Sequence, residues 1–273
     1  MEHAVLLAPT QSMVGVVTEA EVHDDRARPA LVFLNAGLVH RVGPNRLHVR
    51  LARDAARRGF VSLRFDLSGI GDSAPRLDGS SVRTAALTDV RDALDFVAAE
   101  HRATSFILVG LCSGADLAFR AALADARVVG VILIDGLPYT TARSRIHHYA
   151  MRLIRRGGWK RLFARDHPVW RRLRRWRRPP VRPGSAGRRR DVPPLREAEA
   201  GLRELARRGV RMLLLFTAGR EYSYGGQFRD MFPSVRSDRI DVAFFRNADH
   251  TFTLRANQDM LLHTIDEWIA KFH

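Results

Sequence analysis

Short apolar runs alternate with longer segments of helical periodicity along most of the chain. Continuous apolar runs are typical of strands that are buried on both faces. Apolar positions that repeat every three or four residues indicate amphipathic helices. The runs predict strands at 4–8, 13–17, 30–34, 61–65, 106–111, 128–134, 212–216 and 240–245. The periodic segments predict helices at 45–58, 81–101, 113–124, 195–208, 225–232 and 257–272.

This alternation predicts an α/β fold. Repeated strand–helix–strand units return the chain between parallel strands through helices. We therefore expect one mostly parallel sheet with helices on both faces, formed by a core of residues 1–139 and 195–273. Residues 140–194 lack a strand pattern and end in a stretch rich in Pro, Gly and Arg. They are expected to form a helical lid insertion between the two parts of the core.

The positive charge of the chain is concentrated in one segment. The chain has 45 Lys+Arg and 29 Asp+Glu, a net charge of +16. Residues 143–190 hold 18 of the cations and one acid, Asp166, so this basic segment carries +17 and the rest of the chain −1. Three of the four Trp residues lie in the same segment, which repeats apolar residues at helical spacing. The core is therefore close to neutral, and one segment is strongly basic.

Several classes of protein are excluded by the same composition. A single Cys excludes a disulfide scaffold, and 46% apolar residues exclude a wholly disordered chain. No run of about 18 apolar residues is present, so we expect no transmembrane helix. The segment Met1-Glu2-His3 lacks the basic region of a secretory signal, and a cytoplasmic protein is expected.

The strongest chemical motif is Gly-Leu-Cys-Ser-Gly at 110–114, between a predicted buried strand and a predicted helix. In a Gly-x-nucleophile-x-Gly turn, the central residue lies on a sharp turn that larger flanking side chains would obstruct. The two glycines flank Cys112, whereas leucine and alanine would flank Ser113, so the register selects Cys112. The start of a helix also favours a thiolate. The alternative is a small buried Cys in an ordinary strand-to-helix turn.

Three further segments, in order along the chain, complete a resemblance to the α/β-hydrolase family. Residues 33–37 (Phe-Leu-Asn-Ala-Gly) end a strand where the family carries its oxyanion loop. Residues 66–73 (Asp-Leu-Ser-Gly-Ile-Gly-Asp-Ser) are similar to its Asp-x-x-Gly-x-Gly-x-Ser turn, and residues 247–252 (Asn-Ala-Asp-His-Thr-Phe) resemble its catalytic histidine loop. The resemblance covers most of the chain outside the insertion. A Cys replaces the usual Ser, as in dienelactone hydrolase and some carrier-protein thioesterases and cyclases.

The resemblance implies a role for each of these segments. Cys112 would be the nucleophile, and His250 would be the base that takes and returns a proton. The backbone N–H groups of Ser113, Gly37 and Leu38 would form the oxyanion hole. A surface histidine is the alternative for the position of His250.

The orienting acid has two candidate positions in the family, each after a strand. Asp135 follows the predicted strand 128–134, at the end where ligands bind in parallel sheets, and is favoured. Glu221 follows the strand 212–216 and is the alternative, and a turn-capping role remains the alternative for Asp135. Four further polar residues are candidates to line the substrate pocket: Asn35, His40, Tyr139 and Tyr222.

The expected reaction is acyl transfer through an acyl-Cys intermediate, most simply hydrolysis of a thioester or an ester. Attack of a thiolate on a thioester exchanges one thiolate for another, so a Cys nucleophile suits that substrate. One alternative is an acyltransferase or cyclase acting on a carrier-bound acyl chain, and another is a non-catalytic binding protein with the same fold. No cofactor is expected, and no metal site is expected because no His, Cys and Asp cluster has metal-ligand spacing.

The basic segment allows four interpretations of the function of the lid. The plainest is a lid whose apolar side covers the active site and whose Arg side faces solvent. The second is a docking surface for an acyl carrier protein or for coenzyme A, since both are anionic. The third is contact with a membrane surface, where basic amphipathic helices with Trp bind anionic headgroups. Nucleic-acid binding is the least favoured, because no binding motif accompanies the charge.

Overall fold

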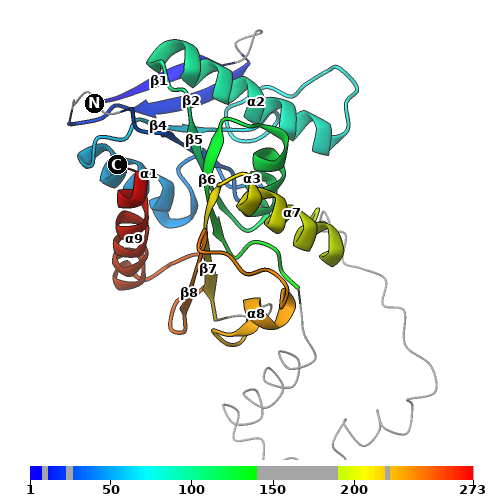
Figure 1. The fold of residues 1–273 in the computed structure, drawn as a ribbon. Helices are drawn as coiled ribbons and strands as arrows, with labels where there is room; N and C mark the ends of the chain where they lie inside the picture. The colour runs from blue at the N-terminus through cyan, green and yellow to red at the C-terminus, as the bar shows by residue number, and fades with distance from the viewer. Residues whose placement is uncertain (8–11, 23–26, 140–189, 219–221, 273) are drawn as a thin grey trace, which may run out of the picture.

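The protein contains an eight-stranded sheet, as described by a computed structural model for residues 1–7, 12–22, 27–139, 190–218 and 222–272. The strands lie in the order β1-β2-β4-β3-β5-β6-β7-β8 (Figure 1). Their bounds are β1 (Glu2–Leu7), β2 (Met13–Thr18), β3 (Ala30–Leu34), β4 (Ser62–Phe65), β5 (Phe106–Leu111), β6 (Val128–Ile134), β7 (Arg211–Thr217) and β8 (Ile240–Phe245).

The sheet is mostly parallel, as the alternation of strands and helices predicts. Strands β3 to β8 pair in parallel, whereas β2 runs antiparallel to β4 and β1 runs antiparallel to β2. The parallel strands all end at the same edge of the sheet. The loops that follow β3, β5, β6 and β8 therefore meet at that edge, where parallel sheets bind ligands.

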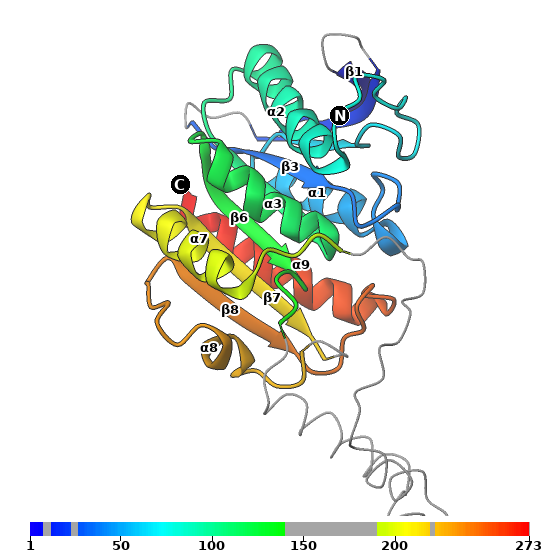
Figure 2. The ribbon, with the colours of Figure 1, turned by 90° about the vertical axis from the view of Figure 1, so that its right-hand side faces the viewer.

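Helices cover both faces of the sheet (Figures 1 and 2). Helices α1 and α9 pack on one face, and α2, α3 and α7 pack on the other. The helical elements are η1 (Pro44–Arg46), α1 (Leu47–Arg57), α2 (Val82–His101), α3 (Ser113–Ala124), α7 (Leu195–Arg207), α8 (Gln227–Met231), α9 (Arg255–Ile269) and η2 (Ala270–Phe272). The predicted fold class is confirmed, and the described elements form one layered core.

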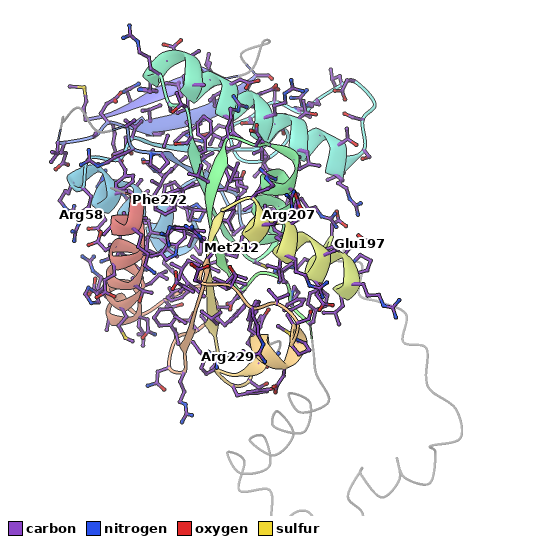
Figure 3. The ribbon with its side chains drawn as sticks, viewed as in Figure 1. Arg58, Glu197, Arg207, Met212, Arg229 and Phe272 are labelled. Atoms are coloured by element: carbon purple, nitrogen blue, oxygen red, sulfur yellow. The ribbon has the colours of Figure 1, made fainter. Side chains whose placement is uncertain are left out.

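The two faces follow from the apolar runs. In β5, Phe106 and Leu108 join the core under α2 and α3, and Ile107 and Val109 join the core under α1 and α9. Successive side chains of a strand point to opposite faces, so a strand buried on both sides must be apolar throughout. Met212 of β7, labelled in Figure 3, is fully buried under the helices.

Several predicted bounds match the structure, and others differ for identifiable reasons. The predicted segments 30–34, 106–111, 113–124, 128–134 and 240–245 coincide with β3, β5, α3, β6 and β8. Strand β1 begins at Glu2, not at residue 4, because Glu2 pairs with Thr18 of β2. Helix α1 begins at Leu47, not at residue 45, because Asn45 and Arg46 adopt left-handed conformations with φ of 50° and 60°.

The predicted lid falls largely on residues 140–189, which lie outside the described residues. The boundaries proposed for the insertion and the two parts of the core therefore stay a prediction. In the part of the chain that the structure describes, no helix is both long enough and apolar enough to cross a membrane.

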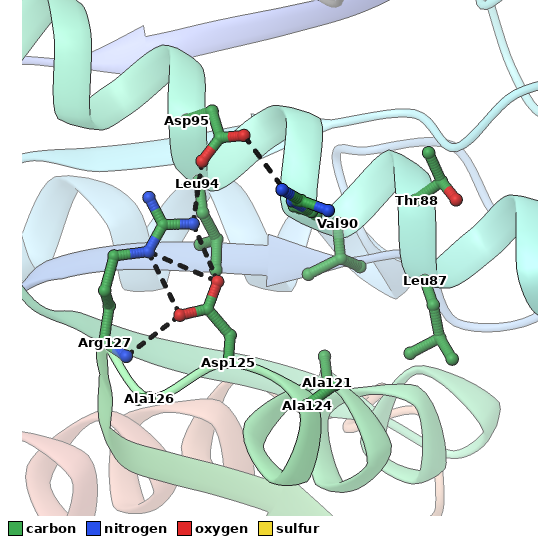
Figure 4. Close-up of a pocket in the computed structure, with 11 residues that line it drawn as sticks. Leu87, Thr88, Val90, Leu94, Asp95, Ala121, Ala124, Asp125, Ala126 and Arg127 are labelled. Atoms are coloured by element: carbon green, nitrogen blue, oxygen red, sulfur yellow. Dashed lines mark hydrogen bonds and ion pairs between the residues drawn. The ribbon is translucent and has the colours of Figure 1, made fainter.

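A groove of about 640 Å³ lies between α2 and α3 (Figure 4). Arg127 contacts Asp95 at 2.8 Å and Asp125 at 2.7 Å beside it. Asp125 directly follows α3, whereas Cys112 directly precedes this helix of 12 residues. A rise of 1.5 Å per residue separates the two ends by about 18 Å. The groove is therefore distant from the nucleophile turn.

Candidate active site

Cys112 lies on a sharp turn between β5 and α3, with φ 58° and ψ −120°. A Cβ on Gly110 would lie 2.2 Å from the carbonyl oxygen of Gly114, and a Cβ on Gly114 would lie 2.6 Å from that of Asn35. Both contacts involve backbone atoms that cannot move aside, so both positions require glycine. A left-handed Cys is a strained conformation, and such residues cluster at functional sites. The turn has the geometry that the motif predicts for Cys112 at its centre.

The structure brings His250 and Asp135 together from two different loops. Asp135 directly follows β6, and His250 follows β8. The Nδ1 atom of His250 lies 2.7 Å from Oδ2 of Asp135. A carboxylate can only accept, so Nδ1 carries the proton, and Nε2 is left for the other side of the ring. The Asp135 side chain is buried, whereas 46% of the His250 side chain is exposed.

Thr217, at the end of β7, fixes the carboxylate of Asp135. Its backbone N–H donates to Oδ1 at 2.7 Å, and its hydroxyl donates to Oδ2 at 2.6 Å. The buried carboxylate thus accepts three hydrogen bonds, counting that of His250. A buried charge needs such partners, since an unpaired one would be costly. Asp135 is therefore held in one orientation, facing His250.

The electrostatics of the site favour a charged pair of Cys112 and His250. Burial opposes ionisation of the Cys112 thiol, but a hydrogen bond from His250, the charge of Arg190 and the N–H of Ser113 together lower its pKa. The hydrogen bond to Asp135, with a further one to Cys112, raises the pKa of His250 from 6.5 to about 10. Both shifts favour the charged pair, a thiolate beside an imidazolium, over the neutral pair.

The expected oxyanion loop lies beside this turn, and one of its donors is occupied. Residues 36–39 form a tight turn in which Gly37 has φ 62°, and Leu38 is exposed. The N–H of Gly37 donates to the hydroxyl of Ser113 at 2.7 Å. The side chain of Ser113 therefore satisfies a donor that was expected to hold an oxyanion. The N–H of Ser113 itself contributes to the lowered pKa of the Cys112 thiol.

Asp66 ties the oxyanion loop to the turn at 66–73. Its Oδ1 accepts from Asn35 Nδ2 at 3.0 Å and from the N–H of Arg41 at 2.6 Å. A Cβ on Gly71 would lie 2.3 Å from Oδ2 of Asp66, so this turn requires glycine. The Asp-x-x-Gly-x-Gly-x-Ser motif thus positions the neighbouring loop instead of performing chemistry.

Two groups among the described residues bring potential metal ligands within 4.8 Å of one another: His40, Asp66 and Asp72, and His3, Glu19 and His101. In the first group, Nη1 of Arg41 lies 2.5 Å from Asp66 Oδ2 and 2.7 Å from Asp72 Oδ2. A guanidinium already supplies the positive charge between these carboxylates. We therefore interpret this group as an ion-pair network.

The four candidate pocket residues all have partners within the protein. Asn35 is buried and bonds to Asp66, and His40 contacts Asp72 at 3.1 Å. The hydroxyl of Tyr139 donates to the carbonyl of Pro193. Tyr222 is buried, and its hydroxyl lies 2.7 Å from the carbonyl oxygen of Gly136. These side chains thus hold loops in place, and their role in lining a substrate pocket stays a prediction.

The alternative acid, Glu221, lies outside the described residues. Three residues of the site were not identified from the sequence: Thr217, Arg190, which donates to the carbonyl of Cys112, and Asp116, which forms an ion pair with Arg190. Thr217 gave a weak signal, as a polar residue directly after a predicted buried strand. Asp116 lies four residues after Cys112 in a helix, and Arg190 is one cation among the 18 of its segment, so neither stands out.

Comparison with known proteins agrees with this architecture. The sequence profile described as the alpha/beta hydrolase family matches residues 31–261. No curated protein sequence matches the chain. Solved structures that resemble it include alpha/beta hydrolase domain-containing protein 10 from mouse, with 18% identity, a TM-score of 0.56 and coverage of 99% of this chain and 100% of that one. Naproxen esterase from Bacillus subtilis has 16% identity and a TM-score of 0.59, covering 100% of this chain and 91% of that one.

Dienelactone hydrolase from Anabaena variabilis has 13% identity and a TM-score of 0.59, covering 100% of this chain and 98% of that one. Identities this low show a shared fold, and the printed activities belong to those proteins. The family profile, in contrast, spans most of the chain and includes the turn at Cys112 and the loop at His250. The chain therefore belongs to the alpha/beta hydrolase family.

Proposed function

We propose that the protein is a hydrolase that cleaves thioesters or esters through an acyl intermediate on Cys112. His250 is the general acid and base, and Asp135 orients it. The observation that carries the proposal is the chain of contacts from the buried Asp135 carboxylate, through His250 Nδ1 at 2.7 Å, to a thiol on a strained turn at the start of α3. Membership of a hydrolase family supports the reaction class.

The reaction begins with the thiolate of Cys112, which forms a bond to the acyl carbonyl carbon. The carbonyl electron pair moves to oxygen, and the tetrahedral species collapses as the bond to the leaving group breaks. His250 donates its Nε2 proton to that leaving group. Water then attacks the acyl-Cys carbonyl and gives a proton to His250. The acid is released, and the thiolate–imidazolium pair is restored.

The negative oxygen needs hydrogen-bond donors in place before it forms. The N–H of Ser113 lies at the start of α3, and the N–H of Gly37 faces the same turn. The oxyanion would replace the Ser113 hydroxyl on the Gly37 N–H, after that hydroxyl rotates away. A donor of this kind contributes about 3 kcal/mol to transition-state stabilisation.

A Cys nucleophile favours thioesters, because a thiolate then displaces a thiolate of similar basicity. The acyl-Cys also remains activated, so an amine, alcohol or carbon nucleophile can replace water. An acyltransferase or cyclase acting on a carrier-bound chain is therefore the second candidate. Docking of an acyl carrier protein or coenzyme A on the basic segment 143–190, or contact of that segment with a membrane surface, would extend either function.

Turnover of a panel of thioesters, lactones and oxygen esters tests the function. The wild-type protein is expected to hydrolyse at least one thioester, and Cys112→Ala is expected to lose at least about 10³-fold in kcat. Ser113→Ala is expected to keep turnover. A folded Cys112→Ala variant that keeps turnover, or a Ser113→Ala variant that loses it, would contradict the assignment. A thiol that labels with iodoacetamide no faster than free cysteine would favour the non-catalytic binding protein.

A further inference from the structure

Arg190 connects the two loops that carry Cys112 and Asp135. Its Nη2 donates to the carbonyl oxygen of Cys112 at 2.9 Å and to that of Asp135 at 2.6 Å. The same guanidinium forms an ion pair with Asp116 through Nε and Nη2. Arg190 is the last residue of the basic segment 143–190.

The ion pair of Arg190 and Asp116 is itself tied to both loops. Asp116 lies in the first turn of α3, and its Oδ1 accepts from the N–H of Leu137 at 2.9 Å. The Asp116 side chain is 3% exposed, and that of Arg190 is 16% exposed. A buried carboxylate and a guanidinium that share several hydrogen bonds form a specific and strongly coupled contact.

The loops that this ion pair joins are strained. Cys112, Asp135 and Leu137 have φ of 58°, 49° and 52°, and they are three of the seven non-glycine residues with positive φ in the described part of the chain. Such conformations cost about 1–3 kcal/mol each and persist only where surrounding contacts enforce them. Arg190 bonds directly to the carbonyls of Cys112 and Asp135, and Asp116 bonds to the N–H of Leu137.

We propose that Arg190 is a positioning residue that clamps the strained turn of Cys112 to the strained turn of Asp135. The guanidinium acts on the site through the backbone carbonyls of Cys112 and Asp135 and through the Asp116 carboxylate. It acts by fixing the distance between nucleophile and acid, and by placing a positive charge beside the turn. Its consequence for turnover rests on the proposed function, whereas its effect on the thiol does not require turnover.

The reactivity of the thiol gives a direct readout. Cys112 is the single Cys of the chain, so iodoacetamide reports this thiol alone. The charged groups that act on its ionisation, among the described residues, are His250, which Asp135 contacts, and Arg190, which Asp116 contacts. The pH midpoint of the alkylation rate therefore measures what Arg190 contributes.

The experiment compares the full chain with Arg190→Gln, Arg190→Lys and Arg83→Gln. Arg83 forms an exposed ion pair with Asp191 and is the matched control. We expect Arg190→Gln to raise the midpoint by about one pH unit, which slows alkylation about tenfold below the midpoint. Arg190→Lys should lie between it and the wild type, since Lys keeps the charge but not the fork of donors. Arg83→Gln should match the wild type.

An Arg190→Gln midpoint equal to that of the wild type would overturn the proposal. The single variant Arg190→Gln leaves the buried Asp116 carboxylate without this ion pair and can therefore unfold. The double variant, Asp116→Asn combined with Arg190→Gln, is the second test. It removes both charges and keeps an acceptor for the Leu137 N–H. A raised midpoint in the folded double variant supports the clamp, and an unchanged one overturns it. A midpoint shift without acyl turnover in the wild type would refute the proposed function but not the clamp.

Discussion

Replacing Asp135 with Asn tests the most specific contact of the site. The amide keeps the size of the carboxylate, and its oxygen can still accept from the N–H of Thr217. The new NH₂ group replaces Oδ2, which accepts from both the Thr217 hydroxyl and His250. The hydroxyl can rotate and become an acceptor. The Nδ1 atom of His250 must then also accept, so its proton moves to Nε2, which faces Cys112.

That exchange removes the carboxylate that raises the pKa of His250 to about 10, and with it the counter-ion of the thiolate. The same substitution lowers kcat by about 10⁴-fold in a Ser-His-Asp triad. We expect a loss of at least about 10³-fold here, because a thiol ionises more readily than a hydroxyl. Folding should lose about 1.5–3 kcal/mol, the contribution of one hydrogen bond to a charged group.

The assay is kcat and KM on the best thioester, with urea unfolding to follow stability. Glu221→Gln is the matched control, since Glu221 is the alternative acid, and it should stay within about twofold of the wild type. An Asp135→Asn variant within tenfold of the wild type, together with a loss of about 10³-fold in Glu221→Gln, would refute the assignment of Asp135.

Three other results are expected. Activity should follow a bell-shaped pH profile. It should fall at low pH, where the Cys112 thiolate with its lowered pKa is protonated, and fall again near pH 10, where His250 loses its proton. A profile that rises only above pH 9 would contradict the ion pair. Gly110→Ala places a Cβ 2.2 Å from a backbone oxygen, so it should lower the free energy of unfolding in urea by about 3 kcal/mol or more. Gly225→Ala, whose Cβ has no contact shorter than 3.5 Å, should leave that free energy nearly unchanged. Tyr222→Phe leaves a loop carbonyl without its hydroxyl partner and should cost about 1 kcal/mol in the same assay; an unchanged midpoint would refute that role.

The sequence predicts the fold and the turn of Cys112 because both depend on local patterns. A strand buried on both faces must be apolar throughout, which is why β3, β5 and β6 match their predicted bounds. The turn at 110–114 needs glycine at two positions for steric reasons, so the residue at its centre can be predicted from the order of residues alone.

Contacts between distant segments could not be predicted in the same way. Arg190 is separated from Cys112 by 78 residues, and nothing in its neighbours distinguishes it from the other cations of its segment. The hydrogen bond between Gly37 and Ser113 depends on how two loops meet in space. The hydrogen bonds of Asn35 to Asp66 and of Tyr222 to Gly136 likewise join segments that are far apart in the chain.

The central claim is that Cys112 carries the acyl group. Intact-mass spectrometry of the protein, quenched in acid during turnover of a thioester, with peptide mapping of the adduct, tests it directly. The account predicts one added acyl group on Cys112, present in Ser113→Ala and absent from Cys112→Ala. An acyl group on Ser113, or turnover in Cys112→Ala, would contradict it.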